Sequence, residues 1–173
     1  MELTFKQSFI DKYSGLTNFA HYKTAVEEFS PKTIRVNTLK TTVKNVKRLL
    51  SEKGWTLTNI PWCNKGFIVT HETTRRDIGN TDEHRDGLFF VQKSVSMIPS
   101  LVLAPKPHDI VLDMSASPGG KTTHLAALMK NTGIIIANES DKKRITVLHQ
   151  NLQRCGVLNS VITNHSGERL DPA

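Results

Sequence analysis

Apolar residues recur at helical spacing near the start of the chain and give way to strand-like runs after Pro31. Residues 5–29 carry large apolar side chains at roughly helical spacing, which predicts helix, although Gly15 argues against one continuous helix. Alternating β-branched and polar residues predict a strand at 33–37, and helical spacing predicts a helix at 43–50. Further strands are predicted at 55–60, 66–70 and 88–91. This β-α-β-β order predicts a small α+β module.

The pattern changes after a predicted linking helix at 94–103 and the sequence Pro105-Lys106-Pro107. Short aliphatic runs at 110–113, 133–137 and 160–163 predict strands. Between them the sequence predicts a helix at 121–130 and an amphipathic helix at 141–154. Such an order is typical of half of a doubly wound parallel sheet. The predicted fold class is therefore α/β, with a Rossmann-like half-sheet over residues 107–173 that follows the small α+β module and linking helix of residues 1–106.

Charge is unevenly distributed between these two regions. Residues 1–108 contain 16 Lys and Arg against 10 Asp and Glu, so they hold a surplus of 6 of the net charge of +7. A basic surplus suits binding to a phosphate backbone, but it equally suits an ordinary solvated surface.

Several classes of protein are not expected. The longest aliphatic run, Ile134 to Ala137, is too short to span a bilayer, and the first twenty residues lack the apolar core of a secretory signal. Two cysteines, Cys63 and Cys155, and seven scattered histidines do not form a metal-binding pattern. We expect an intracellular protein with no membrane partner and no metal.

A glycine turn joins the strand that ends at Asp113 to the next helix. Gly120-Lys121-Thr122 matches half of a phosphate-binding P-loop, but Ser115 stands where that motif needs its first glycine. The three-glycine dinucleotide fingerprint is also absent. A purely structural turn is the remaining alternative. Against it, Glu139 ends the next predicted strand, 20 residues after Gly119, where nucleoside-binding folds place the acceptor of the ribose hydroxyls.

The segment from Leu112 to Thr123, LDMSASPGGKTT, resembles the SAM-binding signature of the Sun/Nop family of RNA cytosine-5 methyltransferases, which includes RsmB, RsmF and the nucleolar Nop proteins. Other segments resemble that family in the same order along the chain. They are Arg35 to Lys40, Pro61-Trp62-Cys63 with Gly66-Phe67, Gly87 to Gln92 with Ser94, Ser96 and Met97, Met129 to Gly133, and Asn151 to Gly156. The resemblance covers nearly the whole chain.

The resemblance implies that S-adenosyl-L-methionine (SAM) is the cofactor and that RNA, specifically ribosomal RNA, is the partner. Glu139 would hold the ribose, and Ser166 would contact the adenine where the family usually has an aspartate. The methionine part would be wrapped by Ser115, Ala116, Ser117, Pro118, Gly119, Gly120 and Lys121. The first region would be the family's RNA-binding module, with Arg35, Asn37 and Lys40 as candidate contacts.

The same resemblance implies chemistry that residues 1–173 do not contain. The family adds a cysteine thiolate to cytosine C6 and uses a second cysteine for elimination, and these lie in Asp-Ala-Pro-Cys and Thr-Cys motifs absent from this sequence. Cys63 and Cys155 are interpreted as structural, so no catalytic residue is predicted and the chain alone is expected to be inactive. The alternative is a non-catalytic RNA-binding or SAM-binding paralogue. We expect a cytoplasmic location, or a nucleolar one in a eukaryote.

Overall fold

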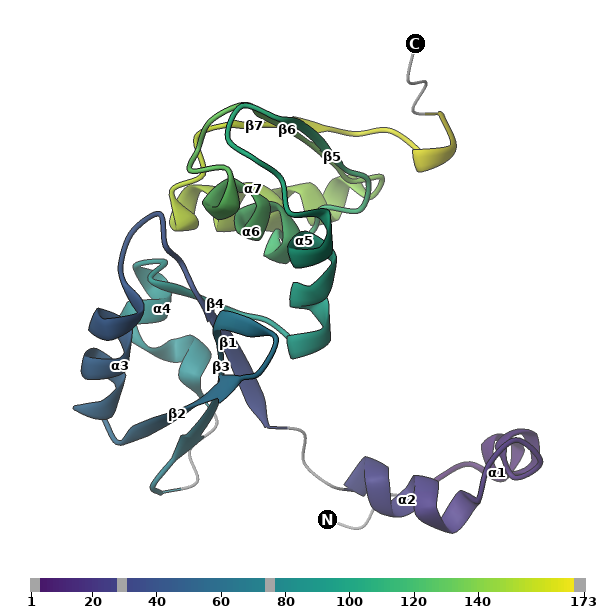
Figure 1. Cartoon of the computed structure of the whole chain (residues 1–173). Coiled ribbons are helices and arrows are strands. Elements are labelled where there is room, and N and C mark those ends of the chain that lie inside the picture. Colours follow the sequence, from purple (N-terminus) through teal and green to yellow (C-terminus); the bar gives the residue numbers. More distant parts are fainter. Residues whose placement is uncertain (1–3, 28–30, 74–76, 170–173) are drawn as a thin grey trace. The chain divides into compact units, whose positions relative to one another are not determined.

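The computed structural model describes residues 4–27, 31–73 and 77–169, and the chain divides into two compact units (Figure 1). The units are residues 1–31 and 32–173. The predicted division at residues 106/107 thus lies inside the second unit and stays a prediction.

The first unit consists of two helices, α1 (Gln7–Tyr13) and α2 (Phe19–Glu27). They are separated by a turn that contains Gly15, as the interrupted apolar pattern predicts. Aromatic rings hold the unit together: the ring centroid of Phe5 lies 5.5 Å from those of both Phe9 and Phe19. Each helix is short, so the stability of this unit depends on these ring contacts more than on helix propensity.

An antiparallel sheet begins the second unit. It consists of β1 (Lys32–Val36), β2 (Trp55–Ile60), β3 (Cys63–His71) and β4 (Phe89–Val91), in the order β2-β3-β1-β4. The helix α3 (Val43–Ser51) packs Val46 and Leu50 against this sheet, and the Thr42 side chain caps its first turn by accepting from the Asn45 amide. The predicted β-α-β-β order is confirmed, with the short helix α4 (Asp82–Arg85) added before β4.

Two predicted elements differ in detail. The strand β3 starts at Cys63 rather than Gly66, because the two-residue turn at 61–62 lets Cys63 pair directly with Ile60 of β2. The predicted linking helix is a 3₁₀ turn, Ser94–Met97, followed by α5 (Ile98–Leu103). Pro99 lies in the first turn of α5, where its missing amide does no harm, so the regular helix begins beside it.

A parallel sheet completes the second unit. Its strands β5 (Ile110–Asp113), β6 (Ile134–Asn138) and β7 (Ser160–Thr163) lie in that order, and the helices α6 (Gly120–Leu128) and α7 (Lys142–Cys155) cover one face (Figure 1). Their buried side chains, including Leu125, Leu148 and Leu152, pack on Ile135 and Ala137 of the central strand β6. The Rossmann-like half-sheet predicted from the sequence is confirmed.

Candidate cofactor site

The three parallel strands bring their carboxyl ends to one edge of the sheet, and the predicted site residues gather there. Asp113 ends β5, Glu139 directly follows β6, and Ser166 lies three residues beyond β7. Met114 directly follows β5 at this edge. Its methyl carbon lies close to Gly167, since a Cβ built on Gly167 would be 3.3 Å from it. Open α/β sheets bind their ligands at this edge.

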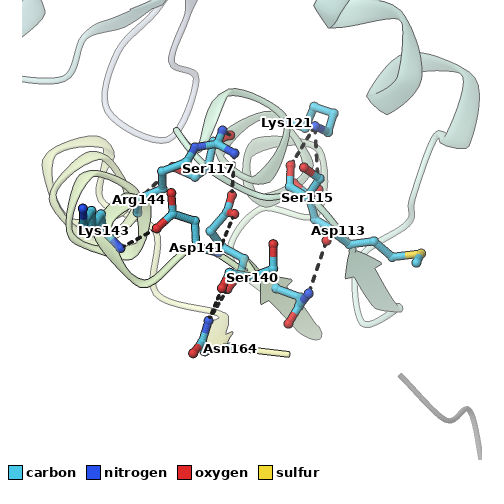
Figure 2. Close-up of polar contacts among 12 residues, drawn as sticks. Asp113, Ser115, Ser117, Lys121, Ser140, Asp141, Lys143, Arg144 and Asn164 are labelled. Carbon is cyan, nitrogen blue, oxygen red and sulfur yellow. Dashed lines mark hydrogen bonds and ion pairs between the residues drawn. The ribbon is translucent and has the colours of Figure 1, made fainter. Parts of the chain in front are cut away.

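The turn between β5 and α6 is held closed by its own hydrogen bonds. The Lys121 ammonium donates to the Ser115 carbonyl at 3.0 Å and lies 3.8 Å from the Asp113 carboxylate (Figure 2). Thr122 Oγ1 donates to the other Asp113 oxygen at 2.8 Å. Because Lys121 is turned back onto its own loop, it is not held out as the free ammonium that a P-loop directs at phosphates.

Glycine is required at one point of this turn. Gly119 has a φ of +105°, a conformation that residues with a Cβ rarely adopt, and it leads directly into α6. Its amide donates to the Ala116 carbonyl at 2.7 Å, so this N–H is committed within the turn. Pro118, which follows a cis peptide bond, presents its carbonyl to the Asn151 side chain of α7 at 2.8 Å. A bound anion would therefore have to use amides after Gly119.

Glu139 is a buried carboxylate with one oxygen in use and one left over. Its side chain is only 3% exposed, and Oε1 accepts from the Asp141 amide at 3.1 Å. Oε2 lies 3.3 Å from an Arg144 guanidinium nitrogen, but no group in the described part of the chain is aligned to donate it a hydrogen bond. A buried acceptor without a donor is costly, and a ligand hydroxyl would satisfy it.

Arg144 was not predicted, and it connects the two halves of the site (Figure 2). Its Nη2 donates to the Ser117 carbonyl at 2.8 Å, and the Ser117 hydroxyl donates back to the Arg144 carbonyl at 2.9 Å. The sequence did hold a signal for it. Lys142, Lys143 and Arg144 begin α7, where the helix dipole disfavours cations, so a carboxylate partner nearby could have been inferred.

Asn138 was also missed, and it fixes the three strand ends relative to one another. Its amide nitrogen donates to the carbonyls of Met114 and His165, and its oxygen accepts from the Thr163 hydroxyl at 3.0 Å. The side chain is fully buried. An asparagine at the end of an aliphatic strand gives no distinctive sequence signal, so only the structure reveals this role.

The three residues predicted to contact RNA make intramolecular contacts in the second unit. Arg35 is buried and donates to the Gly120 carbonyl and the Thr123 hydroxyl, each at 2.7 Å. Asn37 is buried and donates to the carbonyls of Gly87 and Cys155, and the Lys40 ammonium donates to those of Asp86 and Arg154. The geometry assigns these side chains to the junction of the two sheets, and contact with RNA stays a prediction for them.

Both cysteines are buried and free. Cys63 packs with Ile60 and Met97, and burial raises the pKa of the Cys155 thiol, although nearby cations, Arg154 first, oppose the shift. Burial of both side chains away from solvent, with the raised pKa of Cys155, is typical of unreactive thiols, so the interpretation of both cysteines as structural stays our prediction. Within residues 4–27, 31–73 and 77–169, no helix could cross a bilayer and no group of three metal-binding side chains occurs.

Comparison with known proteins divides the chain between two family descriptions. Residues 5–94 match the N-terminal domain of the 16S rRNA methyltransferase RsmF, and residues 100–172 match the 16S rRNA methyltransferase RsmB/F family. Among curated relatives, "Ribosomal RNA small subunit methyltransferase F" of Vibrio parahaemolyticus is 43% identical over 152 residues, covering 87% of this chain and 32% of the relative. The Vibrio vulnificus protein of the same name is 47% identical over 138 residues, covering 79% and 29%. The chain spans about a third of the length of these relatives.

Solved structures share the fold. A methyltransferase homologue from Pyrococcus horikoshii is 37% identical, with a TM-score of 0.78 over 94% of this chain and 57% of that one. NSun6 from the same organism, solved with SFG, is 20% identical, with a TM-score of 0.80 over 93% and 65%, which shows likeness of fold alone.

Proposed function

Since this chain belongs to the RsmB/RsmF family of 16S rRNA methyltransferases, we propose that residues 1–173 supply the RNA-binding module and part of the cofactor site of a SAM-dependent rRNA cytosine-5 methyltransferase. The observation that carries the proposal is the buried Glu139 oxygen without a hydrogen-bond donor at the carboxyl end of β6. The cytoplasm is the proposed location.

The residues present fit the cofactor. Glu139 Oε2 can accept from a ribose hydroxyl once Arg144 moves aside, and the Arg144 side chain is about half exposed, so it has room to do so. The exposed Ser166 follows β7 at the same edge, where its hydroxyl can accept from an adenine amino group. A cavity of about 350 Å³ beside Asp113, Ser115 and Lys121 leaves space near the turn. When bound, SAM would supply the methyl group, and Ser115 to Lys121 would orient it.

The RNA side of the proposal is supported by charge. The surplus of 6 positive charges falls in residues 1–108, and α3 carries the exposed Lys44 and Arg48, although Arg48 is paired with Glu52. The hairpin between β2 and β3 adds Trp62, an aromatic side chain more than half exposed. An exposed aromatic ring suits stacking with an unpaired base, and exposed cations suit the phosphates that join the bases. We therefore propose that the RNA contacts of the module include exposed side chains of this kind. Contact of RNA with Arg35, Asn37 and Lys40 stays a prediction.

The test of the cofactor assignment is a calorimetric titration of the protein with SAM, repeated in excess ATP. We expect SAM to saturate one site with its affinity unchanged by ATP, because the turn lacks the phosphate cradle of a P-loop. Competition by ATP would instead support the nucleotide-binding alternative, and absence of SAM binding would remove the proposal.

The test of the RNA assignment is the salt dependence of binding to an rRNA fragment. Neutralising two or more phosphates of unpaired RNA should give a slope of about −1.4 or steeper in log affinity against log salt, or about sevenfold weaker binding at 200 mM than at 50 mM. Fluorescence anisotropy measures this directly. An affinity that does not change with salt would mean that the basic surplus is ordinary surface.

One alternative keeps specific support. Neither Cys63 nor Cys155 is placed as a nucleophile, so the described residues also suit a protein that binds RNA or SAM without methylating. Residues 1–173 alone are expected to be inactive in either case, so the distinguishing assay is methyl transfer from labelled SAM to rRNA by the full-length product of the gene. Only a methyltransferase would label the RNA.

A further inference from the structure

The antiparallel sheet is connected to the cofactor turn by one buried cation. Arg35 projects from β1, is 2% exposed, and reaches the first turn of α6. Among the described residues no carboxylate forms an ion pair with it, and burial lowers its pKa to about 10, so it remains charged at neutral pH. Burial of an unpaired charge costs folding free energy, so we expect its hydrogen bonds to have a structural or functional role.

The hydrogen bonds of Arg35 connect it to the start of α6 and to Gln92. Nη1 donates to the Gly120 carbonyl and to the Gln92 side chain, and Nη2 donates to the Thr123 hydroxyl. Gln92 is itself fixed by donating to the Ser96 carbonyl at 2.8 Å. These contacts fix the position of Gly120, the residue that both ends the glycine turn and begins α6.

We propose that Arg35 is a positioning residue of the cofactor site, which holds the glycine turn in its binding conformation from the sheet behind it. The inference rests on the proposed function, because it assigns the cofactor to that turn. It also gives the RNA-binding module a direct mechanical connection to the cofactor through β1.

The chain offers a closely matched control in Arg154. This arginine also joins the two sheets, donating from α7 to the carbonyls of His84 and Phe89, and its guanidinium lies 5.5 Å from the Phe90 ring centre. Arg35 lies 5.8 Å from the same ring. The two arginines therefore share a ring and a joining role, but only Arg35 contacts the turn of the cofactor site directly. Arg154 reaches the turn only through Asn151, because it donates to the Asn151 side-chain oxygen and the Asn151 amide donates to the Pro118 carbonyl.

The experiment compares SAM affinity in Arg35→Met and Arg154→Met, measured by calorimetry well below each melting temperature. We expect Arg35→Met to raise the Kd for SAM about tenfold, as loss of one charged hydrogen-bonding partner does, and Arg154→Met to change it less than twofold. Equal shifts in the two variants would show that Arg35 only joins the sheets, and an unchanged Kd in Arg35→Met would overturn the proposal.

Two further measurements test the proposal independently. Thr123→Val keeps the side-chain volume but removes one acceptor of Arg35, so it should shift the Kd in the same direction, by a smaller factor, even if Arg35→Met fails to fold. Amide hydrogen exchange needs no SAM: the Thr123 amide, which donates to the Gly119 carbonyl at 2.9 Å, should lose protection in Arg35→Met and keep it in Arg154→Met. If the unmodified protein binds no SAM, the proposed function fails, while unchanged exchange in Arg35→Met would by itself refute the positioning role.

Discussion

Glu139→Gln is expected to weaken SAM binding by about 1.5–3 kcal/mol, or about 10- to 100-fold in Kd. The buried Oε2 accepts no hydrogen bond in the described structure, and a ribose hydroxyl would form a charge-assisted one with it. Glutamine keeps the shape of the side chain but removes the charge, and it can present an amide donor where the ribose also offers a donor. Calorimetry on both proteins measures the difference.

The control is Glu52→Gln on α3. Glu52 is also a carboxylate paired with an arginine, Arg48, at 2.7 Å, but the pair is exposed and lies on the antiparallel sheet's helix, away from the cofactor edge. The Glu52→Gln protein should bind SAM with the same affinity as the unmodified protein. Since Glu139 Oε1 also accepts from the Asp141 amide at the start of α7, melting curves must show that the Gln variant is folded. An unchanged Kd in a folded Glu139→Gln protein would remove Glu139 from the site.

No covalent adduct is expected when residues 1–173, SAM and RNA containing 5-fluorocytosine are incubated together. In the mechanism that the family resemblance implies, a thiolate adds to C6 and the methyl group is then transferred from SAM to C5. Fluorine at C5 cannot leave as a proton would, so elimination is blocked and the adduct persists. Cys63 and Cys155 are each 1% exposed, and the buried Cys155 thiol has a raised pKa, so neither can present a thiolate to a base. A denaturing gel reads out the adduct.

The positive control is a protein that contains both the Asp-Ala-Pro-Cys and the Thr-Cys motif, which should give a shifted band. If residues 1–173 also gave one, Cys63→Ser and Cys155→Ser would identify the cysteine responsible. Loss of the band in either variant would show that a buried cysteine becomes accessible on RNA binding, and its interpretation as structural would be wrong.

The strands and helices could be predicted because their signals are local. The run Ile110 to Asp113 is aliphatic and is followed by a glycine turn, and Leu148 and Leu152 stand one helical turn apart, so the parallel half-sheet follows from spacing alone. The position of Glu139 at a strand end follows from the same pattern. Its unsatisfied oxygen does not, because it depends on how Asp141 and Arg144 at the start of α7 are placed against the carboxylate.

The roles of Arg35 and Asn37 could not be predicted because they depend on what covers β1. Polar residues alternating with Ile34 and Val36 are typical of a strand with one solvated face, and cations on such a face suggest RNA. In the structure that face of β1 is covered instead: Arg35 donates to α6, and Asn37 donates to the end of α7. The alternation of polar and apolar residues does not show whether the polar face of a strand contacts water or a helix that lies 85 residues away in sequence.

The long sequence separation of these contacts has a consequence for the order in which the protein can fold during synthesis. Asn37 and Lys40 donate to carbonyls of Cys155 and Arg154, so the loop closed by these contacts spans more than a hundred residues. A ribosome makes β1 early, yet the α6 partners of Arg35 and the partners of Asn37 and Lys40 at the end of α7 are made much later. The donors of Arg35 and Asn37 must therefore stay hydrated until α6 and α7 have been translated. The strands of the antiparallel sheet can pair before then, but its packing on the parallel sheet comes last.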